Sequence, residues 1–443
     1  MKIHFIGIGG IGLSNLASLY LQQGHKIQGS DVKESEITKE LREKGVKVFI
    51  GHKAKNVRKK TDKVIYSEAV SEDNVELKNA KRFGIKCQSG AQALGEFSKN
   101  YFTIAVSGMH GKGTTASMIA QILQKAGLDP TFVIGTKPGS RLGKSRYLVL
   151  EADEYKAKFL NYHPNTLVLT NVDREHLDFF KTFNNILKVF SQYLNQVKDL
   201  IIANGDDKNI DKILKSRKGK KKVKVKIKRY SLKQKEAKNI KKILKIPGIH
   251  NVSNALAALT IARALKIPDN VSFKALSEYK GSWRRFEEKD LKIEKEGARR
   301  RREGGGSGVV KLKIISDYAH HPTEIEATLK AAREKFPKRK IWCCFQPHQY
   351  QRTFYLFRDF VDVFKKAPVD KLIITDIYDV AGREDKNIKK KVSPQKLVEA
   401  IKKPYALYLP KNKIVDYLKK NIKNKEVVII MGAGDIYKLI DQF

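Results

Sequence analysis

The sequence YFTIAVSGMHGKGTTA, residues 101–116, places an apolar run directly before a glycine-rich loop. After the loop, apolar residues recur at Ile119, Ile122, Leu123 and Ala126, the spacing of one face of a helix. A strand, a glycine-rich loop and a helix in this order can cradle phosphates, because the loop amides and the helix N-terminus attract anions. We therefore predict a parallel-sheet domain that binds a nucleotide.

The loop departs from a strict Walker A motif. Val106 occupies its first glycine position, and Gly113 follows Lys112 where Ser or Thr is usual. The lysine would bring a positive charge to the phosphates, and a threonine hydroxyl could bind Mg²⁺. A chance Gly-Lys pair is the alternative. The strand–loop–helix setting favours nucleotide binding.

A second glycine-rich turn lies near the start of the chain, with the pattern Gly7-x-Gly9-Gly10-x-Gly12. It follows an apolar strand and precedes a helical pattern over residues 11–23, so a phosphate is favoured there. Asp31 ends the next predicted strand, where a carboxylate could bind a ribose. The motif does not distinguish NAD from a UDP-linked ligand, and a tight turn without a ligand is the alternative.

Polar residues follow two further apolar runs of the central region. Residues 147–150 lead into Glu151-Ala152-Asp153-Glu154, and residues 167–169 lead into a segment with Asn171, Asp173, Glu175, His176 and Asp178. Ligands gather at the carboxyl ends of parallel strands, and carboxylates there suit Mg²⁺. A lone acid after a strand is usually only a loop residue. Two successive strands with this pattern favour a metal site.

Further polar candidates lie later in the chain. Asn251 precedes a predicted helix and would either contact a base edge or cap the helix. Two neighbouring histidines, His320 and His321, follow Asp317. Neighbours in an extended segment point in opposite directions, so contacts to nucleotide or substrate are favoured over a shared metal ion. Arg285, in the run WRRFE, suits a phosphate, and a solvated linker charge is the alternative.

Length and composition limit the architecture. A chain of 443 residues with repeated strand–helix alternation predicts α/β domains with parallel sheets, over residues 1–99, 100–280 and 281–443. The longest apolar runs are too short to span a bilayer. Three cysteines, two of them adjacent, exclude a disulfide framework and favour the reducing cytoplasm.

The formal net charge of +42 raises the question of a nucleic-acid partner. The lysines are spread along the chain, with a dense block over residues 212–245 and a short Arg run at 299–302. No aromatic residues are interleaved for base stacking, so a solvated surface that attracts anionic substrates is favoured. The alternation over 222–227 predicts an exposed edge strand. Residues 297–308, GARRRREGGGSG, predict a mobile hairpin tip.

Taken in order, these motifs resemble the Mur ligase superfamily, in particular its muramate–alanine branch. The segments are GIGGIGLS, SGMHGKGTTA, EADEYKAKFL, TNVDREHLD, PGIHNVSNALAA, WRRFE, DYAHHPTEI, FQPHQYQRT and TDIYDVAGRE. The resemblance covers nearly the whole chain. It implies an α/β fold of three domains: a Rossmann-like N-terminal domain that binds a UDP-linked substrate, a central P-loop ATPase-like domain with a parallel sheet, and a Rossmann-like C-terminal domain.

The resemblance implies a cytoplasmic ligase that uses ATP and Mg²⁺ to join L-alanine to UDP-N-acetylmuramate through an acyl phosphate, in peptidoglycan precursor synthesis. Two alternatives stay open at this point. One is a Mur-type ligase that adds a whole peptide during wall recycling. The other is a non-catalytic homologue with a degenerate phosphate loop. The oligomeric state is not predicted.

The resemblance also implies residue roles. The expected nucleotide contacts are Gly108, His110, Gly111, Lys112, Gly113, Thr114, Thr115, Asn251, Arg285 and Asp317. The expected substrate contacts are Gly9, Gly10, Gly12, Asp31, Ser67, His110, His348 and Arg352. The expected metal ligands are Thr114, Glu151 and His176. The expected catalytic residues are Lys112, His176, His321 and Arg352.

The chain departs from the family pattern at three places. Met109 and Gly113 replace the threonines of the usual GTHGKTT. Related folylpolyglutamate ligases use Gly-Lys-Gly-Ser, so Thr114 would then serve the metal. Glu68 stands where a second serine often lies near the UDP phosphates, and an acid there would repel a diphosphate. The basic stretch 207–247 is shorter than usual.

Overall fold

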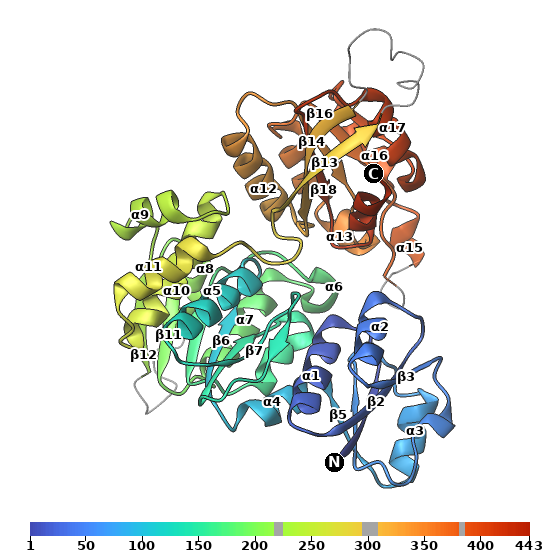
Figure 1. The fold of residues 1–443 in the computed structure, drawn as a ribbon, viewed down its shortest axis with the longest axis vertical. Coiled ribbons are helices and arrows are strands. Elements are labelled where there is room, and N and C mark those ends of the chain that lie inside the picture. Colours follow the sequence, from blue (N-terminus) through green and yellow to red (C-terminus); the bar gives the residue numbers. More distant parts are fainter. Residues whose placement is uncertain (217–224, 295–308, 381–385) are drawn as a thin grey trace. The chain divides into compact units, whose positions relative to one another are not determined.

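The computed structural model describes residues 1–216, 225–294, 309–380 and 386–443, which form three sheets flanked by helices (Figure 1). The predicted hairpin tip at 297–308, with its Arg run, lies outside the described residues, as do residues 222–224 of the predicted edge strand. Within the described ranges, no helix combines the length and the apolar character needed to cross a membrane.

The first sheet has the strand order β3-β2-β1-β4-β5, and all its neighbours are parallel. Its strands are β1 (Lys2–Ile6), β2 (Lys26–Asp31), β3 (Lys47–Ile50), β4 (Lys63–Tyr66) and β5 (Lys86–Ser89). Its helices are α1 (Ile11–Gln22), α2 (Glu36–Glu43), α3 (Val75–Arg82), α4 (Gly90–Ser98) and a 3₁₀ turn at Ala54–Asn56. The order reverses at β1, which places the glycine-rich turn at the switch point where ligands bind in such sheets.

The second sheet has the order β12-β11-β10-β6-β9-β7-β8 and is parallel except for β8. Its strands are β6 (Phe102–Ser107), β7 (Thr131–Val133), β8 (Ser140–Arg141), β9 (Tyr147–Glu151), β10 (Thr166–Leu169), β11 (Leu200–Asn204) and β12 (Lys226–Tyr230). Its helices are α5 (Lys112–Lys125), α7 (Phe183–Leu194), α8 (Lys208–Ser216), α9 (Glu236–Ile243), α10 (Ile249–Ala264) and α11 (Asp269–Glu278), with a 3₁₀ segment at Tyr155–Asn161. Because β9 and β10 flank β6, their carboxyl ends border the phosphate loop. β12 lies at the sheet edge with exposed residues, so the predicted edge strand is confirmed within the described part, a few residues later than expected.

The third sheet has the order β13-β14-β18-β15-β16-β17, with β13 antiparallel to β14. Its strands are β13 (Glu287–Glu294), β14 (Val309–Asp317), β15 (Ile341–Phe345), β16 (Lys371–Ile374), β17 (Ala406–Tyr408) and β18 (Val427–Met431). The helices are α6 (Leu177–Phe180), α12 (Pro322–Lys335), α13 (Tyr350–Tyr355), α14 (Phe357–Lys365), α15 (Lys386–Lys389), α16 (Pro394–Ile401) and α17 (Ile414–Asn421), with 3₁₀ turns at Lys411–Lys413 and Ile436–Gln442.

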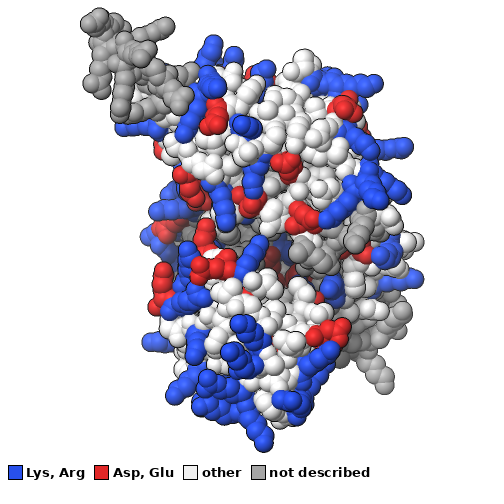
Figure 2. Space-filling model, turned by 90° about the vertical axis from the view of Figure 1, so that its right-hand side faces the viewer, with Lys and Arg blue, Asp and Glu red and all other residues white. Residues whose placement is uncertain are grey.

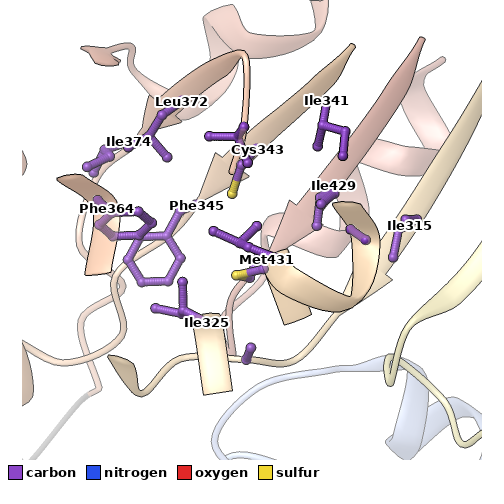
Figure 3. Close-up of a cluster of buried hydrophobic side chains, with 14 of the residues drawn as sticks. Ile315, Ile325, Ile341, Cys343, Phe345, Phe364, Leu372, Ile374, Ile429 and Met431 are labelled. Atoms are coloured by element: carbon purple, nitrogen blue, oxygen red, sulfur yellow. The ribbon is translucent and has the colours of Figure 1, made fainter. Parts of the chain in front are cut away.

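Both faces of this third sheet are covered. Cys343, Phe345 and Met431 pack against α12, α14 and α16 in one core (Figure 3). Their strand neighbours, such as Cys344, pack on the opposite face with α17 and the C-terminal 3₁₀ turn. Side chains alternate between faces along a strand, so a sheet buried on both faces needs continuous apolar strands, and IWCCF and VVIIM are such strands.

The chain divides into two compact units. Unit 1 contains residues 1–174, 182–243 and 253–279, and hence the first two sheets. Unit 2 contains residues 175–181, 244–252 and 280–443, and hence the third sheet. Two short pieces of the central region therefore belong to the C-terminal unit, which sequence periodicity does not indicate. The predicted domain boundaries at 99/100 and 280/281 remain predictions.

Candidate active site

The N-terminal glycine-rich loop is held by the end of β2. The Ser30 carbonyl accepts hydrogen bonds from the amides of Gly7 (2.8 Å) and Ile8 (3.0 Å), and Asp31 Oδ2 accepts one from the Gly9 amide at 2.8 Å. A Cβ atom on Gly9 would lie only 2.8 Å from that carboxylate oxygen, so glycine is required for the close approach. Gly10 caps α1, and no atom lies within 4 Å of a Cβ built on Gly12. Asp31, predicted to contact substrate, thus also braces the loop.

Ser67 and Glu68 follow β4 at the same edge of the sheet. Ser67 Cβ lies 3.0 Å from the Cβ position of Gly7, so it borders the glycine-rich loop, and its predicted substrate contact remains a prediction. Glu68 Oε1 accepts a hydrogen bond from the Ala91 amide at 2.8 Å, in the first turn of α4. The partial positive charge of a helix N-terminus stabilises a carboxylate. Glu68, the acid expected to repel a diphosphate, is therefore hydrogen-bonded to the N-terminus of α4.

The residues that follow β10 hold the phosphate loop in place by hydrogen bonds. Asn171 Oδ1 accepts a hydrogen bond from the His110 amide (2.9 Å), and Asn171 Nδ2 donates one to the His110 carbonyl (2.8 Å). Thr170 Oγ1 donates to the same carbonyl at 2.7 Å. Gly111 has φ 80°, and a Cβ atom there would lie 2.5 Å from Asn254 Oδ1, so this position also requires glycine. Loop shape therefore depends on β10 and α10 as well as on its own glycines.

Lys112 opens α5 and turns back over the loop. Its Nζ donates to the carbonyls of Gly108 (2.7 Å) and Met109 (3.1 Å) and lies 2.9 Å from Glu154 Oε2. Glu154 has 1% side-chain exposure. Burial by itself would lower the pKa of Lys112, but the nearby carboxylates of Glu154 and Asp153 outweigh it and raise that pKa. The amine is therefore held charged in the phosphate loop.

Unit 2 contains a buried ion pair between Glu175 and Arg352. Arg352 Nε donates to Glu175 Oε1 at 2.9 Å, and both side chains are about 5% exposed. His321 Nε2 lies 3.9 Å from Glu175 Oε2, and Arg352 Nη1 lies 3.1 Å from His348 Nδ1. Burial alone would raise the pKa of Glu175, but the charge of Arg352 and the neighbouring histidines hold it well below its usual range. Two predicted site residues, Arg352 and His321, thus meet at one carboxylate, and His348 joins them through Arg352.

Three family models match the chain in order along the sequence. They are described as Mur ligase family, catalytic domain (residues 2–102), Mur ligase middle domain (106–262) and Mur ligase, glutamate ligase domain (305–434). Enzymes called UDP-N-acetylmuramate--L-alanine ligase from Acetivibrio thermocellus and Clostridium tetani are each 39% identical to this chain, over 100% of it and 95% and 97% of their own lengths. The chain belongs to the Mur ligase family.

Solved structures agree with the fold. The UDP-N-acetylmuramate-alanine ligase from Thermotoga maritima has a TM-score of 0.77 at 24% identity, covering 100% of this chain and 98% of that one. A murein peptide ligase from Psychrobacter arcticus has a TM-score of 0.71 at 23% identity, with the same coverage. The predicted α/β fold with three Mur ligase domains is therefore confirmed.

In this Mur ligase, Gly113 is one of two glycines that lie beside the Glu151 carboxylate, the other being Gly135. A Cβ atom on Gly113 would lie 3.1 Å from Glu151 Oε2, the same oxygen that accepts a hydrogen bond from the Gly135 amide at 2.6 Å. Thr114 and Thr115, the next two residues of α5, are both buried. The Thr115 hydroxyl is shielded from solvent and has no hydrogen-bond partner among the described residues. The predicted metal role of Thr114 remains a prediction.

The remaining predicted nucleotide ligands of this Mur ligase have local partners. Asn251 Nδ2 donates to the Pro247 carbonyl at 2.7 Å within the first turn of α10. Asp317 accepts hydrogen bonds from the amides of Phe286 and Ala319, both at 2.8 Å, and burial raises its pKa. Arg285 lies 5.0 Å from the ring centre of Tyr318. These contacts position the side chains, and their roles toward a nucleotide remain predictions.

The neighbouring histidines His320 and His321 make different contacts. His320 Nδ1 lies 3.1 Å from Glu324 Oε2, whereas His321 caps α12 by accepting from the Thr323 amide at 3.3 Å. His110 Nε2 lies 3.3 Å from Asp173 Oδ2. His176 caps α6 with left-handed backbone (φ 55°).

Local sequence pattern indicates no specific role for Glu154 and Glu175. Both were visible as acids after a strand, but that signal does not say which basic residue each one meets. Their partners lie 42 and 177 residues away along the chain.

Proposed function

We propose that this Mur ligase uses ATP to join L-alanine to the lactyl carboxylate of UDP-N-acetylmuramate, in peptidoglycan precursor synthesis. The observation that carries the proposal is the phosphate loop after β6, in which the Lys112 amine is held by two loop carbonyls and Glu154. The full-length relatives at 39% identity, named for this reaction, support the choice of substrates.

The reaction has two steps. A carboxylate oxygen of the sugar attacks the γ-phosphorus of ATP, the bond to the bridging oxygen breaks, and ADP leaves with that electron pair. The amine nitrogen of alanine then attacks the acyl carbon, inorganic phosphate leaves, and the nitrogen loses a proton. Phosphoryl transfer requires mainly positioning and charge stabilisation from the protein.

Lys112 supplies that charge at the phosphate loop. Glu154 stabilises its ammonium form before ATP arrives, and the two loop carbonyls direct it over the loop. Lysine is a compact charge that binds phosphate oxygens well. In unit 2, Arg352 is a fixed cation beside His321 and His348, suited to an anionic group such as a carboxylate or phosphate.

Mg²⁺ would reduce the repulsion between ATP and the attacking carboxylate. The donor set near the loop fits this ion, because the Glu151 carboxylate ends β9 beside the first turn of α5, and Mg²⁺ prefers few carboxylate ligands and several waters. We propose Glu151 and His176 as ligands, with Thr114 as the loop hydroxyl.

The N-terminal sheet would bind the UDP-linked substrate. Gly9, Gly10 and Gly12 leave room for close approach at the start of α1, and Asp31 and Ser67 border the same loop. The free cysteines agree with a reducing compartment, and we propose the cytoplasm as the site of the reaction.

The test is ADP release from ATP with UDP-N-acetylmuramate and each amino acid in turn. Release is expected with L-alanine, and without the sugar it should be near zero. Release with a tripeptide but not with alanine would favour the peptide-adding alternative. No release with any acceptor, although ATP binds, would favour a non-catalytic homologue.

A further inference from the structure

The N-terminal domain contains a buried carboxylate that no motif indicates. Glu76, in the first turn of α3, has 0% side-chain exposure. Burying an unpaired carboxylate is costly, so its partners must compensate for the lost hydration. The question is what this buried charge does for the domain.

Four donors surround the Glu76 carboxylate. Oε2 accepts from His4 Nε2 (2.8 Å) and Ser30 Oγ (2.6 Å), and Oε1 accepts from Asn56 Nδ2 (2.6 Å) and the Lys53 amide (3.1 Å). Burial alone would raise the pKa of Glu76, but the hydrogen bonds from His4 and Ser30, together with the His52 ring whose Nδ1 lies 3.7 Å from Oε1, outweigh it and lower that pKa. The group is therefore a fully satisfied carboxylate that joins β1, β2, the segment after β3 and α3.

The surrounding hydrogen bonds have a definite direction. Gln28 Nε2 donates to the Asn56 carbonyl and lies 3.2 Å from His4 Nδ1, so Nδ1 accepts and His4 Nε2 carries the proton given to Glu76. Ser30 uses its single hydroxyl proton on Glu76 and accepts from His52 Nδ1 at 3.0 Å. Each polar group thus has one consistent role, as a preorganised network requires.

Ser30 connects this network to the glycine-rich loop. Its side chain binds Glu76, while its backbone carbonyl accepts from the amides of Gly7 (2.8 Å) and Ile8 (3.0 Å). Ser30 itself is fully buried. The next residue, Asp31, accepts from the Gly9 amide. Displacing Ser30 would therefore displace three consecutive loop amides.

We propose that Glu76 is a positioning residue for the nucleotide-sugar substrate: by holding Ser30, it keeps the glycine-rich loop in the conformation that receives the substrate diphosphate. This inference rests on the proposed function of the N-terminal domain. Glu76 contacts no reacting atom, so its effect should fall on substrate binding and not on the chemical steps. ATP binding, which uses the other loop, should be unaffected.

The decisive variant is Glu76→Gln. In glutamine, an NH₂ group replaces one of the two carboxylate oxygens. This NH₂ group cannot accept a hydrogen bond from Ser30 or Asn56, so one of those two bonds is lost. We expect the dissociation constant for UDP-N-acetylmuramate, measured by calorimetry on the whole chain, to rise about tenfold. The dissociation constant for ATP and kcat at saturating substrate should stay within twofold, about the scatter of a neutral substitution. Amide exchange in residues 7–9 should become faster, while residues 108–115 exchange as in wild type.

Glu96→Gln is the matched control. Glu96 is also a carboxylate of this domain, with its pKa lowered to about 2 mainly by hydrogen bonds from Gln88 and Lys63, but it does not contact Ser30. Its substitution should leave sugar binding unchanged. If Glu76→Gln fails to fold, Ser30→Ala tests the same connection by removing one hydroxyl, and it should weaken sugar binding at least threefold.

The outcomes separate the two proposals. If wild type does not bind UDP-N-acetylmuramate, both fail. If wild type binds it and a folded Glu76→Gln protein binds it equally well, only the positioning role is overturned. An equal loss of sugar and ATP affinity would mean general destabilisation and would also overturn it. Unchanged sugar binding by Ser30→Ala would exclude the route through Ser30.

Discussion

At the scale of single residues, Lys112 is prepared for phosphate by its neighbours. The amine lies within 3.1 Å of two carbonyls and of Glu154, so it is charged and fixed before any ligand arrives. A preorganised charge stabilises a transition state without the cost of reorganisation. Gly113 and Thr114 follow Lys112 in the loop, and we predict that the Thr114 hydroxyl is the one that meets a metal ion.

Replacing Lys112 with Ala should lower kcat by roughly 10²–10³-fold, because it removes one charge-stabilising group. Binding of UDP-N-acetylmuramate should be retained. Steady-state ADP release and calorimetry check the two halves of this prediction. Lys125→Ala, at the exposed end of the same helix, is the control and should be near wild type. A Lys112→Ala enzyme within threefold of wild type would remove the loop lysine from the mechanism.

Thr114→Val should raise the Mg²⁺ concentration needed for half-maximal rate, if its hydroxyl is the loop ligand. Thr115→Val should not, and it should preserve or raise the melting temperature, because a buried hydroxyl without a partner is replaced by a methyl group. Rate against Mg²⁺ and thermal melting are measured for both. An unchanged Mg²⁺ response in Thr114→Val would show that its hydroxyl is not the loop ligand of the metal ion.

At the scale of elements, the turn before α6 and the helix α13 are joined by one buried ion pair. Glu175 precedes α6, and Arg352 lies on α13, 177 residues later. Removing one partner of such a pair leaves an uncompensated buried charge, which costs far more than the pair itself contributes. The same pair orients His321 and His348, so stability and site geometry are coupled here.

Glu175→Ala and Arg352→Ala should each destabilise unit 2 by about 3–5 kcal/mol, and the double variant by clearly less than the sum. Both tryptophans of the chain, Trp283 and Trp342, lie in unit 2, so urea unfolding followed by tryptophan fluorescence reports on it directly. The exposed pair Arg333–Asp370 provides a control cycle with a coupling below about 1 kcal/mol. Additive effects at Glu175 and Arg352 would contradict the coupling.

At the scale of the whole molecule, two features matter: the pH dependence of stability and the net charge of +42. Figure 2 shows Lys and Arg spread over the visible face with Asp and Glu between them, and not gathered in one stripe. The face visible in Figure 2 therefore shows charge suited to attracting small anions and no single positive stripe of the kind that binds nucleic acid.

His52 should make stability depend on pH. The Glu76 carboxylate, 3.7 Å from His52 Nδ1, raises the pKa of His52 above the usual 6.5, against the effect of burial, with Asp31 adding to the rise. The protonated form is therefore favoured in the folded state, so its stabilisation is present below pH 6.5 and is lost as the pH rises through the folded pKa. The melting temperature should fall between pH 6 and 8, and His52→Gln should flatten this slope. An identical slope in that variant would exclude His52 as the cause.

Salt should weaken substrate binding only moderately. Raising NaCl from about 50 to 200 mM should change the KM for UDP-N-acetylmuramate by less than tenfold, since exposed charges are screened beyond about 8–10 Å. Duplex DNA, tested by fluorescence anisotropy at both salts, should show only weak non-specific binding at the higher salt. A specific complex with DNA that persists at about 200 mM NaCl would support the interpretation that the protein binds nucleic acid.

Local sequence pattern was enough to predict the strands, the helices and the glycine-rich loops between them. Alternation of period 2 and 3.6, together with glycines at 7, 9, 108 and 111, was sufficient to predict α/β domains and two glycine-rich loops. These features depend on neighbours within a few residues, so they are visible along the chain. The family motifs added the order of the domains, which the comparisons confirmed.

Which charged side chains form ion pairs and hydrogen bonds depends on the arrangement of the sheets in three dimensions. Glu154 binds Lys112 because β9 lies beside β6, and Glu76 reaches His4 and Ser30 because α3 packs on a sheet whose order reverses at β1. A buried carboxylate is tolerated only where donors from distant segments converge on it. The order of the strands in the sheet brings these distant donors to one carboxylate, and residue spacing along the sequence does not reveal that order.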